Sequence, residues 1–224
     1  MKKTLFLLLL VALAVSSCAT ARYYGGFTPE SARQDMALLG PVSCIYYLDD
    51  KNQESFSDTL STFSETLIAS LVDEMGVPVS GRIELTEDEE KSEVFELMHY
   101  LAEQRSNKQK YILIPDVLDR ALEEQGCRYG LLVFAEGMTR DKKGYTKDAV
   151  KGAFITLATA ILTLGAATMI VTPEMYSSRI YAAVLDSEMD QVVFFNVRNP
   201  EETHPLRPDP VRKQLKKLLK DYLK

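Results

Sequence analysis

The sequence predicts an α/β or α+β domain, in which helices pack on a mixed sheet of about four to six strands. Short apolar runs of strand length recur along the chain, and helical stretches with one apolar face lie between them. Gly and Pro separate the two kinds of segment. The clearest apolar run is 129–135 (YGLLVFA), which has the length and composition of a buried strand.

The first helix and the first strand are predicted between residues 28 and 48. Thr28 and Pro29 stand in the order typical of an N-cap and a first helical position, and this helix is expected to end near Gly40. Residues 42–48 (VSCIYYL) form a continuous apolar run, which predicts a buried strand. The polar turn 49–52 ends that strand.

A longer helix is predicted from about Ser55 to Gly76, where the glycine and then Pro78 stop it. Its apolar residues recur every three or four positions and define one stripe: Phe56, Leu60, Phe63, Leu67, Leu71 and Met75. The stripe is expected to face the core. The face away from it is expected to carry the polar residues Ser57, Ser61, Ser64 and Glu65.

The middle of the chain predicts a weak strand at 77–85 and then a helix towards Arg105. Thr86 and Glu89 fit a capping box at the start of this helix. Its core face is expected to hold Val94, Phe95, Met98 and Leu101. The acidic cluster 87–90 is interpreted as carboxylates at the positive end of a helix dipole rather than as a cation site.

The remaining elements are a short helix, a hairpin and a closing helix. Pro115 and Asp116 open the short helix, which stops at Gly126. Residues 180–185 and 192–197 read as two strands of a hairpin. A Pro-rich loop at 199–210 leads to a last helix, which is expected to be capped by Asp209 and to begin at Pro210, with its lysines in water.

The N-terminus has the three parts of a secretory signal: Lys2 and Lys3, the apolar run 5–15, and small residues. The run is about 11 residues, whereas a transmembrane helix needs ~20. Residues 15–18 (VSSC) resemble the lipobox of bacterial lipoproteins. The resemblance implies removal of signal peptide 1–17 and a membrane anchor of acyl chains, such as palmitate, on Cys18. Residues 18–28 are then expected to be a lipidated tether, and 29–224 a single domain.

The residues after Cys18 bear on location and on partners. Ala19 stands where an aspartate marks inner-membrane retention in the sorting rule of bacterial lipoproteins. The resemblance therefore implies a lipid-anchored place in the outer membrane, facing the periplasm. Loss of Lys2 and Lys3 takes the net charge from −6 to −8. So acidic a chain argues against nucleic acid as a partner, because phosphates are neutralised by Lys and Arg.

Two cysteines besides Cys18 are candidates for a disulfide. Cys44 lies within the strand 42–48, and Cys127 comes just before the strand 129–135. Adjacent strands would bring them together in a disulfide-permissive compartment. Two buried, unpaired thiols are the alternative.

Residues 152–172 contain no charged side chain, and as a helix they would measure ~32 Å. Three interpretations are open. A stop-transfer span conflicts with the lysines at 142–151, which would lie on the exported side. The others are an element that contacts the membrane or an oligomer, and an apolar helix inserted in the core. Small residues at helical spacing form the predicted contact face: Gly152, Thr156, Thr159, Thr163 and Ala167.

The order of elements over 42–223 resembles the periplasmic α/β domain of curli-secretion-type lipoproteins, and also uncharacterised exported lipoproteins. In that family, a strand like 129–135 follows a helix. A strand ending in an aspartate turn, like 180–186, precedes another strand and a terminal helix. The lipid anchor, the short tether and the apolar block together predict a role in assembly, secretion or envelope maintenance.

The sequence carries no catalytic motif. Its two histidines, His99 and His204, lie far apart without neighbouring Cys or His, so no metal or cofactor is expected. We therefore predict a non-enzymatic protein that contacts other envelope proteins or copies of itself. The alternative is a periplasmic ligand- or glycan-binding lipoprotein, with a pocket lined by the Pro-rich loop and residues 137–150.

Overall fold

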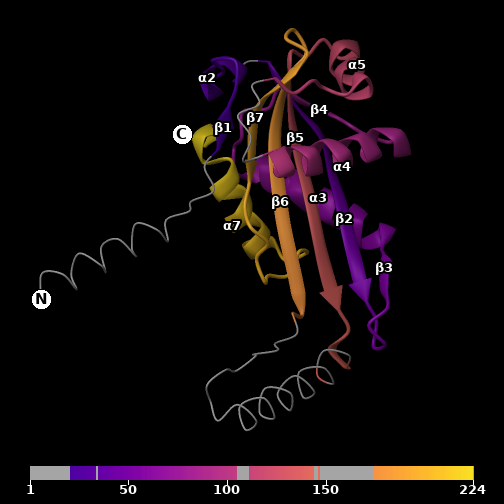
Figure 1. Ribbon diagram of the computed structural model, residues 1–224. Helices are drawn as coiled ribbons and strands as arrows, with labels where there is room; N and C mark the ends of the chain where they lie inside the picture. Colours follow the sequence, from indigo (N-terminus) through magenta and orange to yellow (C-terminus); the bar gives the residue numbers. More distant parts are fainter. Residues whose placement is uncertain (1–20, 34, 105–110, 144–145, 147–173, 224) are drawn as a thin grey trace, which may run out of the picture.

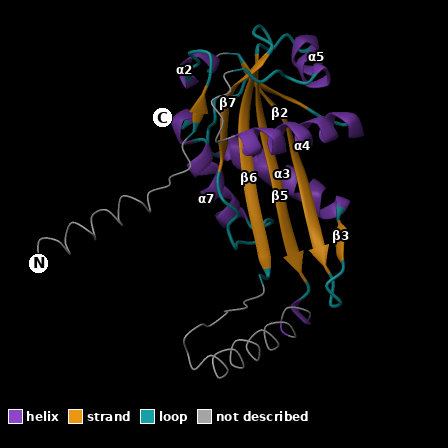
Figure 2. Ribbon diagram, viewed as in Figure 1, coloured by secondary structure: helices purple, strands orange, loops and turns teal. Residues whose placement is uncertain are grey.

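The computed structural model describes residues 21–33, 35–104, 111–143, 146 and 174–223 (Figure 1). In this part of the chain, seven strands form one mixed sheet in the order β1-β7-β6-β5-β2-β3, with β4 also pairing with β2. Helices cover both faces of the sheet (Figure 2). The predicted mixed α/β fold is confirmed. The sheet is wider than expected because three strands of only two or three residues, β1, β3 and β4, extend its edges.

The strands are β1 (Arg22–Tyr23), β2 (Met36–Leu48), β3 (Glu54–Phe56), β4 (Gly81–Ile83), β5 (Tyr129–Arg140), β6 (Tyr176–Asp186) and β7 (Gln191–Val197). The helices are α2 (Pro29–Ala32), α3 (Asp58–Glu74), α4 (Asp88–Glu103), α5 (Asp116–Glu124) and α7 (Pro208–Leu218), followed by the 3-10 helix η2 (Lys220–Tyr222). Strand β5 pairs in parallel with β2 and antiparallel with β6. It is therefore the central strand, as its continuous apolar run predicts.

Two helical layers enclose the sheet. Helices α2, α3 and α7 pack on one face, where Ile68 and Leu215 are fully buried. Helices α4 and α5 pack on the other, where Met98 and Leu118 are fully buried. The C-terminal end of β5 and the N-terminal end of β6 project beyond these helices (Figure 1).

The first helix is much shorter than predicted. Thr28 and Pro29 start α2 as expected, but the helix ends at Ala32 rather than near Gly40. Residues 36–39 instead form the start of β2, which pairs in parallel with β5 from Met36 and with β4 at 37–39. All four are buried, so the sheet takes up an apolar run that the helix would have left half exposed. Gly40 has a φ of 77°, where the register of β2 with β5 shifts.

Helix α3 turns a different face to the core than its apolar stripe predicts. Phe56 and Phe63 are 54% and 55% exposed, whereas Ser61 and Ser64 are buried. Only the C-terminal half follows the expectation, where Leu71 lies in the core.

An unpaired stretch of β2 explains this orientation. Strand β4 pairs with β2 at 37–39 and β3 pairs with it at 46–48, which leaves the edge between them without a strand. Helix α3 supplies the missing partners, because the Ile45 N–H donates to Ser61 Oγ at 3.0 Å and the Ser43 N–H donates to Glu65 Oε1 at 3.1 Å. Buried backbone groups require such partners, and small serines let the helix approach closely.

Two other helix starts are shifted from their predicted positions. Helix α4 has its N-cap at Glu87, whose N–H donates to Glu90 Oε2 at 3.0 Å, so the Thr86–Glu89 box is wrong by one residue. Its buried face carries Leu97, while Phe95 is partly exposed. Helix α7 begins at Pro208, two residues before Pro210. The predicted hairpin β6–β7 and helix α5 are confirmed.

The tether prediction is wrong for part of its range. Arg22 and Tyr23 form β1 against Phe195 and Phe194 of β7, and the aromatic side chain of Phe27 is buried. Aromatic burial and strand pairing thus hold this stretch against the domain. The signal peptide 1–17, Cys18 and the apolar block 152–172 with its five contact residues lie outside the described residues. None of the helices within the described ranges has the length and apolar character of a membrane span.

Candidate functional site

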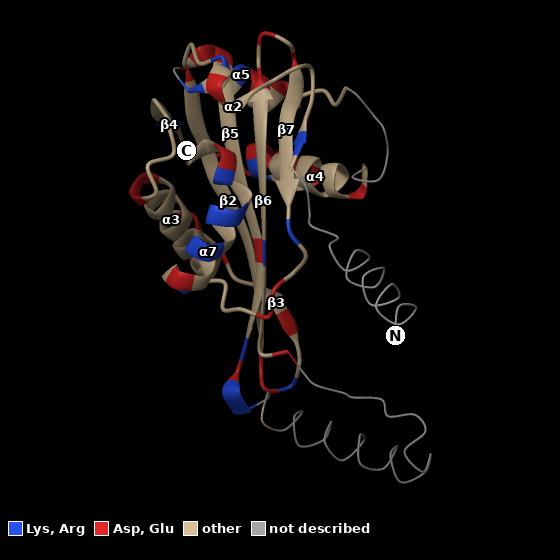
Figure 3. Cartoon of the chain, turned by 90° about the vertical axis from the view of Figure 1, so that its left-hand side faces the viewer, with Lys and Arg blue, Asp and Glu red and all other residues tan. Residues whose placement is uncertain are grey.

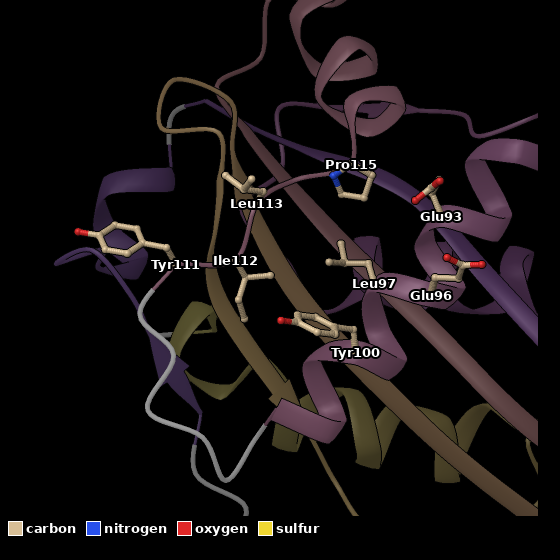
Figure 4. Close-up of a pocket in the computed structure, with 8 residues that line it drawn as sticks. All are labelled: Glu93, Glu96, Leu97, Tyr100, Tyr111, Ile112, Leu113 and Pro115. Atoms are coloured by element: carbon tan, nitrogen blue, oxygen red, sulfur yellow. The ribbon is translucent and has the colours of Figure 1, made fainter.

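A groove of about 740 Å³ runs between α4 and the extended segment 111–115 (Figure 4). Helix α4 contributes one side and the segment contributes the other. The lining residues are Glu93, Glu96, Leu97, Tyr100, Tyr111, Ile112, Leu113 and Pro115. This volume lies within the range of ~300–1,000 Å³ typical of ligand sites.

Helical and strand periodicity place these side chains. On α4, positions 93, 96, 97 and 100 are three, four and seven residues apart and so share one face. The segment 111–115 is held on the edge of β7, where the Val192 N–H donates to the Ile112 carbonyl at 2.8 Å. Its alternation buries Ile112 in the core and leaves Tyr111 and Leu113 each 69% exposed.

The groove combines an apolar floor with an acidic border. Leu97 and Ile112 are buried and belong to the core on this face. Glu93 and Glu96 form the α4 border, and no cation in the described ranges pairs with either carboxylate. Helices α4 and α5 together hold ten carboxylates against two basic side chains, while α7 is basic (Figure 3). This face is therefore strongly acidic.

A second polar cluster surrounds Glu136 on the same face of the sheet. Glu136 Oε1 accepts a hydrogen bond from the Tyr181 hydroxyl and lies 3.5 Å from Arg179 Nη1. Its Oε2 lies 3.2 Å from His99 Nε2 of α4. The Arg179 guanidinium lies 4.9 Å from the centre of the Tyr181 ring and donates to the Arg198 carbonyl.

The Glu136 cluster is a closed network. Burial and then the Glu136 carboxylate raise the pKa of Tyr181 above its ordinary range, so its hydroxyl stays protonated and donates. The carboxylate of Glu136 is thus held by the Tyr181 hydroxyl and Arg179, with His99 in contact. Because His99 comes from α4 and Glu136 from β5, the network fixes α4 on the sheet.

Two smaller cavities flank Glu65. One of about 290 Å³ includes Cys44, Lys91 and Phe95 in its wall, and another of about 230 Å³ includes Arg82 and Glu84. Burial raises the pKa of the Glu65 carboxyl, while the Ser43 N–H and Lys91, 3.8 Å away, act in the opposite direction.

A pH titration of stability tests the environment of Glu65. The folded protein binds a proton at Glu65 more tightly than the unfolded chain, so stability falls as pH rises from the ordinary value of 4.5 through the raised pKa. Glu65→Gln removes this loss. The difference in free energy of unfolding, variant minus wild type, should increase with pH across that window and then level off. Urea denaturation at a series of pH values measures it, and a difference that stays flat or decreases would contradict the raised pKa.

Cys44 and Cys127, the candidates for a disulfide, are both free thiols in the structure, and each is half-buried. Cys44 lies opposite Glu136 in the parallel register of β2 and β5. Cys127 stands nine residues before Glu136 along the chain, which corresponds to ~30 Å of strand, whereas a disulfide needs Cα atoms within ~7 Å. The strands are adjacent as expected, but the two cysteines lie towards opposite ends.

The Pro-rich loop packs against the sheet. A Cβ at Gly137 would meet Pro205 Cβ at 2.7 Å and the Ser177 carbonyl at 2.9 Å, so glycine allows this close approach. His204 in the same loop stacks on Tyr176, and burial and Arg207 lower its pKa. The predicted pocket between the Pro-rich loop and residues 137–150 does not correspond to the groove or to the two cavities beside Glu65, which are lined by other residues. Among the residues that the structure describes, no group of three or more His, Cys, Asp or Glu could hold a metal ion.

Sequence reasoning missed both the groove and Glu136. A signal for the groove was present in the helical spacing of Glu93, Glu96 and Tyr100, followed by the alternating residues at 111–114. A signal for the network was the single acid that follows the apolar run 129–135. Neither signal specifies that α4 and 111–115 lie side by side, because that contact depends on the pairing with β7.

No protein-family model matches the sequence, and no curated protein matches it. Among solved structures, the chain is similar to the PelC dodecamer from Paraburkholderia phytofirmans, with a TM-score of 0.41 and 12% identity over 91% of this chain and 96% of that one. A second crystal structure, of a variant of the same PelC dodecamer, has a TM-score of 0.40 and 12% identity, over 91% of this chain and 97% of that one. Both TM-scores are below 0.5.

Proposed function

We propose that the chain is a non-enzymatic lipoprotein, anchored in the outer membrane through Cys18 and facing the periplasm. There it acts in assembly, secretion or envelope maintenance through protein contacts. The observation that carries the proposal is the position of the VSSC sequence at 15–18, four residues before β1 begins at Arg22. A cleavage and lipidation signal at this position attaches a folded domain directly to a membrane surface.

The polar clusters support a binding or structural role. Glu136 pairs with Arg179 and contacts His99, and Arg128 pairs with Asp186 at 3.0 Å. Such networks stabilise the fold, whereas catalysis needs a nucleophile or base held ready for a substrate. The open groove of Figure 4 provides a surface for contacts instead.

Fractionation of cells that express wild type and Cys18→Ser tests the anchor. Wild type should label with palmitate and require detergent for extraction, because several acyl chains give stable attachment. Cys18→Ser should lose the label and become soluble, and the matched control Cys127→Ser should behave as wild type. An unlabelled, soluble wild-type protein would refute the anchor.

The same experiment bears on the block 152–172. A labelled wild type and a Cys18→Ser variant that stays on membranes would identify a second membrane contact, and deletion of 152–172 from that variant should then release it. A fully soluble Cys18→Ser variant would favour the interpretation of the block as part of the core.

A second candidate function is ligand or glycan binding in the periplasm. The groove between α4 and 111–115 favours it, because its lining combines two tyrosines and two carboxylates with aliphatic side chains. Titration of the purified protein with neutral and amino-substituted oligosaccharides tests this candidate.

A further inference from the structure

We infer that the groove between α4 and 111–115 binds an extended basic peptide segment of a partner protein, with Lys or Arg between apolar residues. The inference deepens the proposed role in protein contacts, and it rests on that role for the partner being a protein.

Charge complementarity argues for a cationic ligand. Glu93 and Glu96 stand one helical turn apart on the border of the groove. Neither carboxylate forms an ion pair with a cation among the described residues. Further carboxylates of α4 and α5 add to the negative potential of this face. Such a field attracts cations over about a Debye length, ~8–10 Å in physiological salt.

The floor argues for side chains with apolar stems. Leu97, Ile112 and Pro115 are aliphatic and lie beside the two carboxylates. A Lys or Arg side chain buries its methylene stem on such a surface while its charged end reaches the acidic border. The rings of Tyr100 and Tyr111 border the same groove, and aromatic rings attract cations.

The polar side chains of the groove favour a cationic ligand over a neutral sugar. Among the described residues that line it, the polar side-chain groups are two carboxylates and two phenol hydroxyls. A cationic side chain pairs with the carboxylates, whereas a neutral glycan would leave their charge unpaired. Exposed Leu113 projects beside the groove from an extended backbone and offers an apolar contact. A peptide with alternating basic and apolar side chains would place its cations at the acidic border and its apolar side chains on Leu113.

Fluorescence anisotropy with the purified full-length protein tests the inference. The probe is a labelled peptide in which Lys alternates with Leu and Ser, and its partner probe carries acetyl-lysine at each Lys. The wild-type protein should bind the first peptide and not the second, and added salt should weaken binding. Glu93→Gln with Glu96→Gln should raise the Kd about five- to ten-fold, because two partly exposed ion pairs are lost.

Matched variants separate the groove from general acidity. Glu123→Gln with Glu124→Gln removes the same charge from exposed positions on α5 and should leave the Kd within about two-fold of wild type. Leu113→Ser should weaken binding without a change in the acidic border. Equal weakening by both double variants, or no effect of Glu93→Gln with Glu96→Gln, would overturn the site.

Two other occupants are outcomes of the same assay. Binding of glucosamine oligomers, lost in Glu93→Gln with Glu96→Gln and unaccompanied by peptide binding, would replace the peptide with a cationic glycan. Peptide binding to Lys108→Gln with Lys110→Gln but not to wild type would mean that the chain's own basic residues fill the groove. Either result overturns the inference. Peptide binding by the purified protein in detergent does not require a lipid on Cys18. The fractionation experiment and the peptide assay can therefore refute the anchor and the groove independently of each other.

Discussion

Arg128→Leu is expected to lower the free energy of unfolding by about 3–5 kcal/mol. Arg128 Nε and Nη2 donate to the two carboxylate oxygens of Asp186 at 3.1 and 3.0 Å. Asp186 is only 1% exposed, at the end of β6. Removal of the guanidinium leaves this buried carboxylate without its cation. The remaining donor, the Glu188 N–H at 3.1 Å, compensates for only part of the loss.

Chemical denaturation followed by circular dichroism measures this effect. The control is Arg120→Leu, an exposed arginine on α5, which should change stability by no more than about 0.5 kcal/mol. The double variant Arg128→Leu with Asp186→Leu should recover part of the loss, because an apolar pair has no buried charge. A single Arg128→Leu variant as stable as the control would show that the pair contributes nothing.

Ser61→Leu is expected to lower the free energy of unfolding by about 2–6 kcal/mol. The change removes the acceptor of the buried Ile45 N–H, which costs about 1–3 kcal/mol. It also forces a larger side chain between α3 and β2 at a buried position, which costs about 1–3 kcal/mol more. Thermal and urea unfolding should both show the loss.

The matched control on the same helix is Phe63→Ser. Because Phe63 is more than half exposed, the loss of its ring should cost less than about 1 kcal/mol. If the apolar stripe of the sequence were the buried face, the order of the two variants would be reversed. The pair thus decides which face of α3 contacts the sheet.

The elements that sequence reasoning predicted well are those with local signals. The apolar run of β5, the turn signals of the β6–β7 hairpin and the Pro–Gly boundaries of α5 are all contained in short windows of sequence. The burial of both faces of β5 follows from its composition alone. These features therefore require no knowledge of distant contacts.

The errors concern features that depend on pairing between distant residues. Strand β1 exists because Arg22 pairs with Phe195, and two residues carry no strand signal of their own. The face of α3 was mispredicted because the unpaired edge of β2 selects hydrogen-bonding side chains over apolar ones. The cysteines were placed on neighbouring strands, but the parallel register that separates them is not visible in either segment.

The start of β1 at Arg22 limits how far the domain would stand from a membrane under the proposed anchor. Four residues reach ~14 Å at most, so a lipid on Cys18 would keep Arg22 within that distance of the bilayer surface. A basic partner attached to the same membrane then meets the groove at an effective concentration of order millimolar. A solution Kd in the high micromolar range is therefore sufficient for a populated complex, and the complex would dissociate once either protein leaves the membrane.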